Sequence, residues 1–323
     1  MALTKAPSAN TVPVTPPRGR ARKPRKQLTW NTLHSLKGFL FTLPFVIGFF
    51  AVFLIPFVYA LIQSVFAVQK SGTGFGPAET VFVGLDNFFQ AGTDPVFWAS
   101  MLRVFLFACV QIPVMLGLSL LMALLLDAMT GRWTKVFRIG LLVPHMIPGI
   151  VAALIWLYLY SPRLGPLTKA GDLFGLNINF FGIDLLFFSI GNLLTWGAIG
   201  FNMLIIYSSL RAVPRDLFEA ARLDGATEGR IAWSIKIPYV RGTLVLTGML
   251  SIIGMLQIFN EPLVFRTTSP ETVTSNFTPI MMIFNQAFTS GNYNYAAALS
   301  VLLAVIVGVV SAFFYKLTNR PQA

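Results

Sequence analysis

Residues 104–126 read VFLFACVQIPVMLGLSLLMALLL, and this stretch contains no Asp, Glu, Lys or Arg. A helix needs about 20 apolar residues to cross the hydrocarbon core of a bilayer, whereas runs of about 10–14 are typical of buried helices in soluble proteins. One charge at the centre of a bilayer costs about 2.5–3.5 kcal/mol on insertion scales. A charge-free run of this length therefore indicates a helix that spans a membrane.

The same pattern recurs along the whole chain. Apolar residues make up 55% of the 323 residues and charged residues 11%, whereas soluble domains carry about 25% charged residues. The charge-free runs predict an all-α membrane protein with six spans, at about residues 39–67, 104–126, 139–160, 185–210, 242–260 and 293–315. Five prolines within these spans or at their ends predict kinks: Pro44, Pro56, Pro113, Pro144 and Pro148.

The N-terminal stretch differs from the rest in composition. Residues 1–27 are rich in Pro, Ala, Thr, Lys and Arg and contain too few apolar residues to fold, so we expect residues 1–35 to form a disordered basic tail. A basic stretch before an apolar run is also typical of a signal peptide. However, the run from Gly38 to Gln69 is much longer than the roughly 7–15 apolar residues of a signal peptide, which favours a retained first span.

Lys and Arg are distributed unevenly between the segments that join the spans. If the N-terminus is inside, the inner segments 1–38, 127–138, 211–241 and 316–323 carry 19 of the 24 basic residues. This distribution follows the positive-inside rule and predicts that both termini are cytoplasmic. It also explains the net charge of +12 by topology and by contact with anionic membrane lipid, which argues against nucleic-acid binding.

Cysteine and histidine are scarce. Cys109 is the only cysteine and cannot form a disulfide within the chain, and His34 and His145 are the only histidines. These numbers exclude a histidine-rich metal site, and the His-Glu-x-x-His motif of a metalloprotease is absent. We interpret His145, which follows Pro144, as a hydrogen-bonded residue at a helix end rather than a ligand.

The segment 211–241, which joins the fourth and fifth spans, is much longer than the roughly 2–8 residues that a helix–helix connection needs. Pro214 suits the first turn of a helix, where its missing N–H would have no partner. Gly225 suits the left-handed residue that follows a helix end. Thr227 is a good N-cap for a second helix, which we expect to end before Pro238. The segment therefore predicts a helix–bend–helix at the cytoplasmic surface that docks a partner.

The same segment carries a resemblance to a known family. Glu219-Ala220-Ala221 is followed by Asp224-Gly225-Ala226 and then by Ile235-Lys236-Ile237-Pro238. This order and spacing resembles the signature loop of permease subunits in binding-protein-dependent ATP-binding-cassette (ABC) importers, where Glu-Ala-Ala precedes a Gly and an Ile-x-Leu-Pro. Ile237 stands where Leu is usual, which preserves the apolar bulk. The resemblance covers residues 36–318.

Four further stretches resemble the carbohydrate-uptake branch of that family, of the maltose and glycerol-3-phosphate importer type. They are residues 82–88, 144–156, 256–262 and 295–300. The resemblance implies the six-span permease fold and one half of a translocation pathway across a bacterial-type plasma membrane. The implied solute is a sugar, an oligosaccharide or a glycerol-phosphate-like compound.

The resemblance also implies partners. Two cytoplasmic ATP-binding-cassette ATPase subunits would bind ATP and Mg²⁺ and would receive the helices of the segment 211–241. A second, homologous permease subunit would complete the pore, and an extracytoplasmic substrate-binding protein would deliver the solute. This sequence has no Gly-x-x-x-x-Gly-Lys-Ser/Thr loop, so we expect no ATP hydrolysis and no cofactor in this chain. The residues implied to couple ATPase and spans are Glu219, Ala220, Ala221, Asp224, Gly225, Ala226, Ile235 and Pro238.

Polar residues in or near the spans are candidates for the solute path, because polar groups in lipid are costly and usually functional. The candidate contacts are Asn202, Gln257, Asn260 and Glu261, with Trp196 and Trp156 as aromatic faces for a sugar ring. Asn and Gln also join helices through hydrogen bonds, and Trp also anchors spans at the interface. Glu261 equally suits the outer mouth of the pathway, where it would contact the binding protein.

Two alternative functions fit part of these observations. The first is an ABC importer permease for a peptide, an amino acid or phosphate, and the identity of the binding protein would distinguish it. The second is a secondary transporter or channel that works without nucleotide. Against the second, no span carries the ionisable relay that ion coupling commonly uses, and the length of the segment 211–241 would have no purpose.

Overall fold

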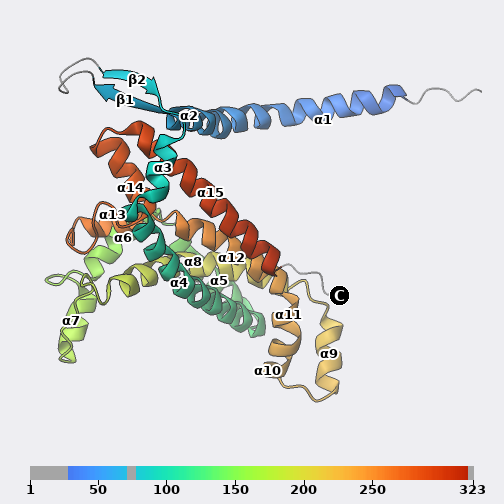
Figure 1. Cartoon of the computed structure of the whole chain (residues 1–323). Coiled ribbons are helices and arrows are strands. Elements are labelled where there is room, and N and C mark those ends of the chain that lie inside the picture. The colour runs from blue at the N-terminus through green and yellow to red at the C-terminus, as the bar shows by residue number, and fades with distance from the viewer. Residues whose placement is uncertain (1–27, 71–77, 319–323) are drawn as a thin grey trace, which may run out of the picture. The chain divides into compact units, whose positions relative to one another are not determined.

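The computed structural model describes residues 28–70 and 78–318 (Figure 1). Within these ranges the regular structure is helical, apart from one sheet of two strands. The chain forms two compact units, residues 1–56 and 57–323. The predicted disordered tail of residues 1–27 lies outside the described residues.

The first unit consists of helix α1 (Leu28–Phe49), a π-helical turn (Phe50–Leu54) and the start of α2 (Ile55–Ser64). The sequence placed residues 28–35 in the disordered tail, and the structure corrects this boundary because α1 already begins at Leu28. The reason is local. No Gly or Pro lies between Leu28 and Gly38, so the helix continues without a break into the apolar run.

A π-helical turn prepares the chain for the proline that follows it. The Ile55 N–H donates to the carbonyl of Phe50, five residues back, and the next residue is Pro56. In an α-helix the ring of a proline clashes with the carbonyl four residues back and removes one hydrogen bond. One residue of extra length in the turn relieves this clash. Pro56, where the sequence predicted a kink, thus follows a local widening of the helix.

Among the described residues, five helical stretches are long and apolar enough to cross a membrane: Gly38–Ser64, Pro95–Ala128 (α4), Leu186–Leu210 (α8), Arg241–Arg266 (α12 and α13) and Tyr293–Thr318 (α15). A sixth consists of two parts, Arg132–Met146 and Gly149–Leu159 (α6), bent by 97°. The first part is α5 (Arg132–Leu142) with a 3₁₀ turn (Val143–Met146). The predicted all-α architecture is confirmed, and the described part of the chain holds up to six candidate spans when the bent pair counts as one.

The bend between Arg132–Met146 and α6 lies at Pro148, where the sequence predicted a kink within one continuous span, the third along the chain. Ile147 has an extended backbone (ψ 126°) because the residue before a proline is pushed out of the helical region. Pro148 is itself extended (ψ 136°) and serves as the N-cap residue of α6. The helix is thus interrupted at Pro148 rather than kinked.

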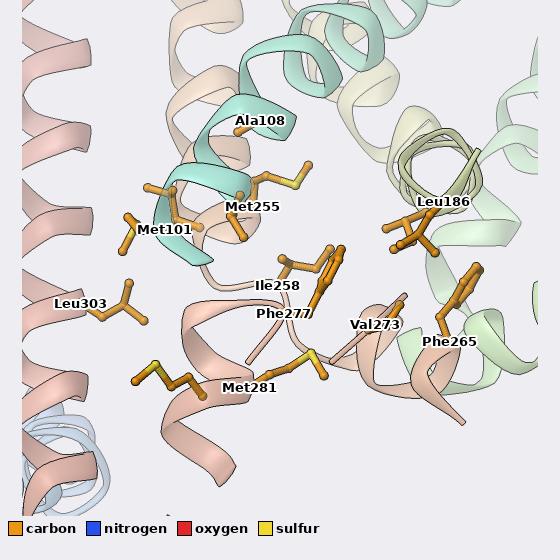
Figure 2. Close-up of a cluster of buried hydrophobic side chains, with 14 of the residues drawn as sticks. Met101, Ala108, Leu186, Met255, Ile258, Phe265, Val273, Phe277, Met281 and Leu303 are labelled. Carbon is orange, nitrogen blue, oxygen red and sulfur yellow. The ribbon is translucent and has the colours of Figure 1, made fainter. Parts of the chain in front are cut away.

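The core of the second unit lies between α4, α8, α12 and α15. Its buried side chains include Met101, Leu186, Met255, Phe277 and Leu303, which converge from these helices and from the loop before α14 (Pro279–Phe284) (Figure 2). Gly200 of α8 permits one close approach: a Cβ there would overlap the backbone carbonyl of Leu141 in α5. Small residues at such positions let membrane helices approach closely.

Short elements cover the end of the bundle that the charge distribution predicts to be outside. Strands β1 (Phe66–Lys70) and β2 (Ala78–Phe82) form an antiparallel hairpin with Phe66 opposite Phe82. Helix α3 (Asp86–Thr93) follows, and its Asn87 Nδ2 donates to the carbonyls of Ser64 and Phe66, each at 2.8 Å. Helix α7 (Pro166–Leu173) packs against α6, and a π-helical turn after α14 (Asn285–Thr289) packs against α15. The sequence did not predict the hairpin.

Candidate functional site

The segment between α8 and α12 folds as two helical arms joined by a tight bend, as predicted. The first arm is α9 (Arg215–Leu223), and Pro214 is its N-cap (ψ 132°), one position earlier than the predicted first turn. Gly225 has φ +80°, which is the left-handed conformation predicted for it. The N–H of Ala226 donates to the Ala221 carbonyl at 2.9 Å, and this six-to-one hydrogen bond closes the helix end in a Schellman motif.

The second arm begins as predicted but ends later. Thr227 caps α10 (Glu228–Ile231) by accepting a hydrogen bond from the backbone of Arg230 at 3.4 Å. The arm then continues through a π-helical turn (Ala232–Lys236) into α11 (Ile237–Tyr239). The prediction that the arm ends before Pro238 is therefore wrong. The cause is the one seen at Pro56: the N–H of the residue before the proline donates five residues back, to Ala232, and the wider turn accommodates the ring.

Most of this segment is exposed. Five of the predicted coupling residues are exposed and three are half-buried: Glu219, Ala220, Asp224, Gly225 and Pro238 are exposed, whereas Ala221, Ala226 and Ile235 are half-buried. Two large apolar side chains also face outward: Leu223 is 90% exposed and Trp233 is 75% exposed. Exposed apolar groups of this size on a polar surface element are typical of a binding surface. The arms therefore offer a surface of small and apolar side chains rather than a closed site.

The base of the segment is buried against the ends of α4, α8 and α12. Val240 is fully buried in a cluster with Ala123, Leu126, Met203, Ile206 and Leu210. Lys236 donates to Asp127 Oδ2 of α4 at 2.6 Å, with both side chains 9% exposed. The sequence analysis missed this pair, although Asp127 was visible as the charge that ends the run 104–126.

Three of the predicted solute contacts lie together at a break in the fifth span. Gln257 is the exposed C-cap residue of α12 (Arg241–Leu256), and Asn260 and Glu261 open α13 (Asn260–Arg266). A Cβ at Gly149, the first residue of α6, would lie 3.1 Å from Glu261 Oε1 and 3.8 Å from Asn260 Nδ2. Broken spans whose backbone is uncoiled between two half-helices are where transporters commonly bind solutes.

The predicted aromatic pair lies further along α6. The rings of Trp156 and Trp196 form an edge-to-face contact with centroids 5.7 Å apart. Trp156 Nε1 is buried without a hydrogen-bond partner among the described residues. Asn202 is buried in α8, and its side chain makes no hydrogen bond within the described ranges. His145 Nδ1 lies 3.0 Å from the Gly197 carbonyl, as the helix-end interpretation predicted.

A groove of about 860 Å³ runs between α4 and α8. Its lining is mostly apolar but includes Arg103, Gln111, Asn192 and Thr195. Gln111 Nε2 donates to the Gly191 carbonyl at 2.8 Å and to Thr195 Oγ1 at 2.7 Å, so this amide joins the two helices. These polar residues within spans were visible in the sequence and were not selected. Among the described residues, no group of three or more His, Cys, Asp or Glu could hold a metal ion.

Comparison with known proteins gives this geometry a family context. The profile of the family described as "Binding-protein-dependent transport system inner membrane component" matches residues 115–320, which include the whole segment 211–241. That match covers more than half of the chain. The matched residues include the two arms, the break in the fifth span and four complete predicted spans.

Individual relatives extend over nearly the full length. The arabinooligosaccharides transport system permease protein AraP of Bacillus subtilis is 27% identical and aligns over 91% of this chain and 93% of its own. The lactose transport system permease protein LacF of Rhizobium radiobacter is also 27% identical, over 89% and 96%. A crystallised bacterial ABC transporter that imports the acidic polysaccharide alginate contains a chain with a TM-score of 0.76 and 18% identity, covering 92% of this chain and 100% of that one. This last likeness establishes a shared fold.

Proposed function

The chain belongs to the binding-protein-dependent transport system inner membrane component family, and from this premise we propose that it is the permease subunit of an ATP-driven importer of sugars or oligosaccharides. The observation that carries the proposal is the exposed helix–bend–helix of residues 214–239, anchored at the end of a bundle of spans. The relatives named for arabinooligosaccharide and lactose transport support a sugar as the solute.

The proposal assigns the driving chemistry to partners. Two ATPase subunits on the cytoplasmic side bind ATP and Mg²⁺, and a second permease of similar fold completes the pathway. The family description itself supports an extracytoplasmic binding protein that delivers the solute. Both termini and the segment 211–241 then face the cytoplasm, which agrees with 19 of the 24 basic residues being on that side.

Docking rests on the exposed surface of the two arms. Glu219 and Asp224 supply charge, and Ala220, Ala221 and Ala226 let a partner backbone or a bulky side chain approach closely. Gly225 sets the angle between the arms through its left-handed backbone. Ile235 lies in the π-helical turn of the second arm, and Pro238 lies in α11, which leads to α12. Movement of the ATPase subunits would displace the arms and, with them, the ends of the spans.

The solute path is proposed at the broken fifth span. Gln257, Asn260 and Glu261 offer amide and carboxylate groups where α12 ends and α13 begins, and such groups suit the hydroxyls of a sugar. Trp196 with Trp156 offers aromatic faces on the neighbouring α8 and α6. Asn202, whose amide has no hydrogen bond among the described residues, is the remaining contact of this path.

Co-purification in mild detergent tests the proposal. The chain, expressed with its natural partners, is expected to carry two ATPase subunits and a second permease. Ala221→Trp adds bulk on the half-buried face of α9 and is expected to release the ATPase subunits. Ala170→Trp, on the exposed surface of α7 at the opposite predicted side, is the matched control and should release nothing. Retention of the ATPase by the Ala221 variant, or absence of any ATPase from the wild-type preparation, would contradict the proposal.

A further inference from the structure

Lys236 stands at a junction of three elements. It lies in the π-helical turn of the second arm, and its Nζ is 2.6 Å from Asp127 Oδ2 in the last turn of α4. The same ammonium lies 5.2 Å from the centroid of the Phe218 ring, which belongs to α9 in the first arm. One cation thus contacts both arms of the segment 211–241, called the docking segment below, and the end of a membrane span.

The burial of this ion pair contrasts with that of its neighbour. Both side chains of the Lys236–Asp127 pair are 9% exposed, whereas the Arg222–Glu228 pair, which also joins the two arms, is 55% and 63% exposed. Exposed ion pairs contribute little because water and salt screen them. A buried pair leaves a charge uncompensated when one partner is lost, so it holds its two elements together more strictly.

Charged residues are scarce in α4, the helix that contains Asp127. Asp127 and Arg103 are the two charged residues of that helix. In the described ranges, residues 28–70 and 78–318, Lys236–Asp127 is the one side-chain hydrogen bond between the docking segment and α4. The other polar tie at the base leads to the chain just after α8, where the Tyr239 hydroxyl donates to the Ala212 carbonyl at 3.3 Å. Of these two hydrogen bonds, the one from Lys236 reaches a membrane span, whereas the one from Tyr239 ends on a residue of the segment 211–241 itself.

We propose that Lys236 is a positioning residue that ties the docking segment to the inner end of α4, so that a displacement of the arms is passed directly to this span. The inference rests on the proposed function, since it concerns motion imposed by an ATPase. Covalent continuity already transmits such a displacement to α8 and α12, which flank the segment. The ion pair adds α4, whose neighbours along the bundle are α8 and α12.

The anchor itself is tested on the purified subunit, without any partner. Lys236→Met keeps the apolar stem and removes the charge, and Asp127→Asn removes the counter-charge. Each is expected to raise amide exchange in residues 215–236 by about tenfold or more, because the segment would open locally from α4. Lys236→Arg keeps the charge and should restore most of the protection. Glu228→Gln, in the exposed pair, is the matched control and should leave the exchange rates nearly unchanged.

A second measurement separates transmission of movement from simple stability. A fluorescent label on Leu125→Cys, an exposed position near the end of α4, reports movement of this helix in a Cys109→Ala background. In the reconstituted complex, ATP binding should change the label's emission. The Lys236→Met variant should lose that change while the ATPase stays bound, and Lys236→Arg should retain it.

The outcomes are distinct. Unchanged amide exchange in Lys236→Met, or an undiminished response of the label in that variant, overturns the proposal. Failure of the proposed function has another signature, because no ATPase would then accompany even the wild-type chain. In that case the exchange measurement on the single subunit still decides whether the pair anchors the segment to α4.

Discussion

Replacing Gly225 with valine tests whether the bend between the two arms is set by backbone conformation. Gly225 has φ +80°, and a Cβ at this position would meet no atom within 4 Å. The cost of the substitution therefore comes from the backbone alone and not from a collision. A left-handed residue with a Cβ costs about 1–2 kcal/mol, and a β-branched residue is a clear outlier there.

A cost of 1–2 kcal/mol corresponds to a change of about 5–30-fold in the population of the bent form. Amide exchange of residues 215–236 in the purified subunit should rise by a similar factor. Gly229→Ala is the matched control, because Gly229 lies in α10, a Cβ there meets nothing within 4 Å and its φ is not in the left-handed range. Alanine favours a helix by about 0.8–1.0 kcal/mol over glycine, so this control should exchange no faster than wild type.

Equal exchange in the Gly225→Val and Gly229→Ala variants would refute the reasoning, since the left-handed backbone would then not hold the bend. In the reconstituted complex, Gly225→Val should also lower the amount of ATPase that co-purifies. The spans should still insert, because their apolar runs are untouched.

Three further outcomes are expected. On a Cys109→Ala background, a cysteine at exposed Asp86 should react with an impermeant thiol reagent in whole cells. A cysteine at exposed Lys135 should react only after the cells are opened, and its labelling in intact cells would contradict the predicted topology. Alanine at Gln257 or Asn260 should weaken solute uptake about two- to tenfold, the loss of one hydrogen bond, with assembly unchanged; normal uptake by both variants places the path elsewhere. Removal of residues 1–27, the basic N-terminal tail, should leave uptake nearly intact. Loss of uptake at normal membrane levels would show that the tail has a role.

The spans could be predicted from the sequence because their signal is strong and local. A charge in the hydrocarbon core is costly, so each charge-free run marks a helix regardless of what surrounds it. Arg103, just before the predicted second span, shows the limit of this rule, because α4 begins earlier, at Pro95, and includes that arginine. Its guanidinium donates to the Phe277 carbonyl at 2.7 Å and lies over the Phe277 ring, a contact 174 residues away that no local pattern indicates.

Prolines illustrate the same division between local and non-local information. The sequence marked Pro148 and Pro238 as places where a helix is disturbed. The physical reason, an extended residue before the proline, holds at Ile147 but not at Ile237, which keeps a helical backbone. At Pro148 the chain bends by 97°, whereas at Pro238 a wider turn absorbs the ring and the helix continues. The proline alone does not distinguish these two outcomes, because both segments carry the same local signal.

The docking segment was largely predictable because caps and bends depend on adjacent residues. Thr227 caps α10 through its side chain, and Gly225 adopts the left-handed backbone that the absence of a Cβ permits. The buried pair of Lys236 and Asp127 was not predictable, since its members are 109 residues apart and each is an ordinary charge at a membrane surface in the sequence. The clustering of Gln257, Asn260 and Glu261 followed from their proximity in sequence, whereas their position beside Gly149 needed the tertiary structure.

The most direct test of the central claim is solute uptake by the purified complex in lipid vesicles. Radiolabelled lactose and a labelled arabinooligosaccharide, the solutes named for two relatives, are offered on the side of the binding protein, with ATP or a non-hydrolysable analogue on the other. The predicted result is that the vesicles accumulate one of these solutes with ATP but not with the analogue. The Ala221→Trp variant is expected to accumulate neither solute. Equal uptake with ATP and with the analogue would contradict the account, because the chain would then conduct the solute without being coupled to an ATPase.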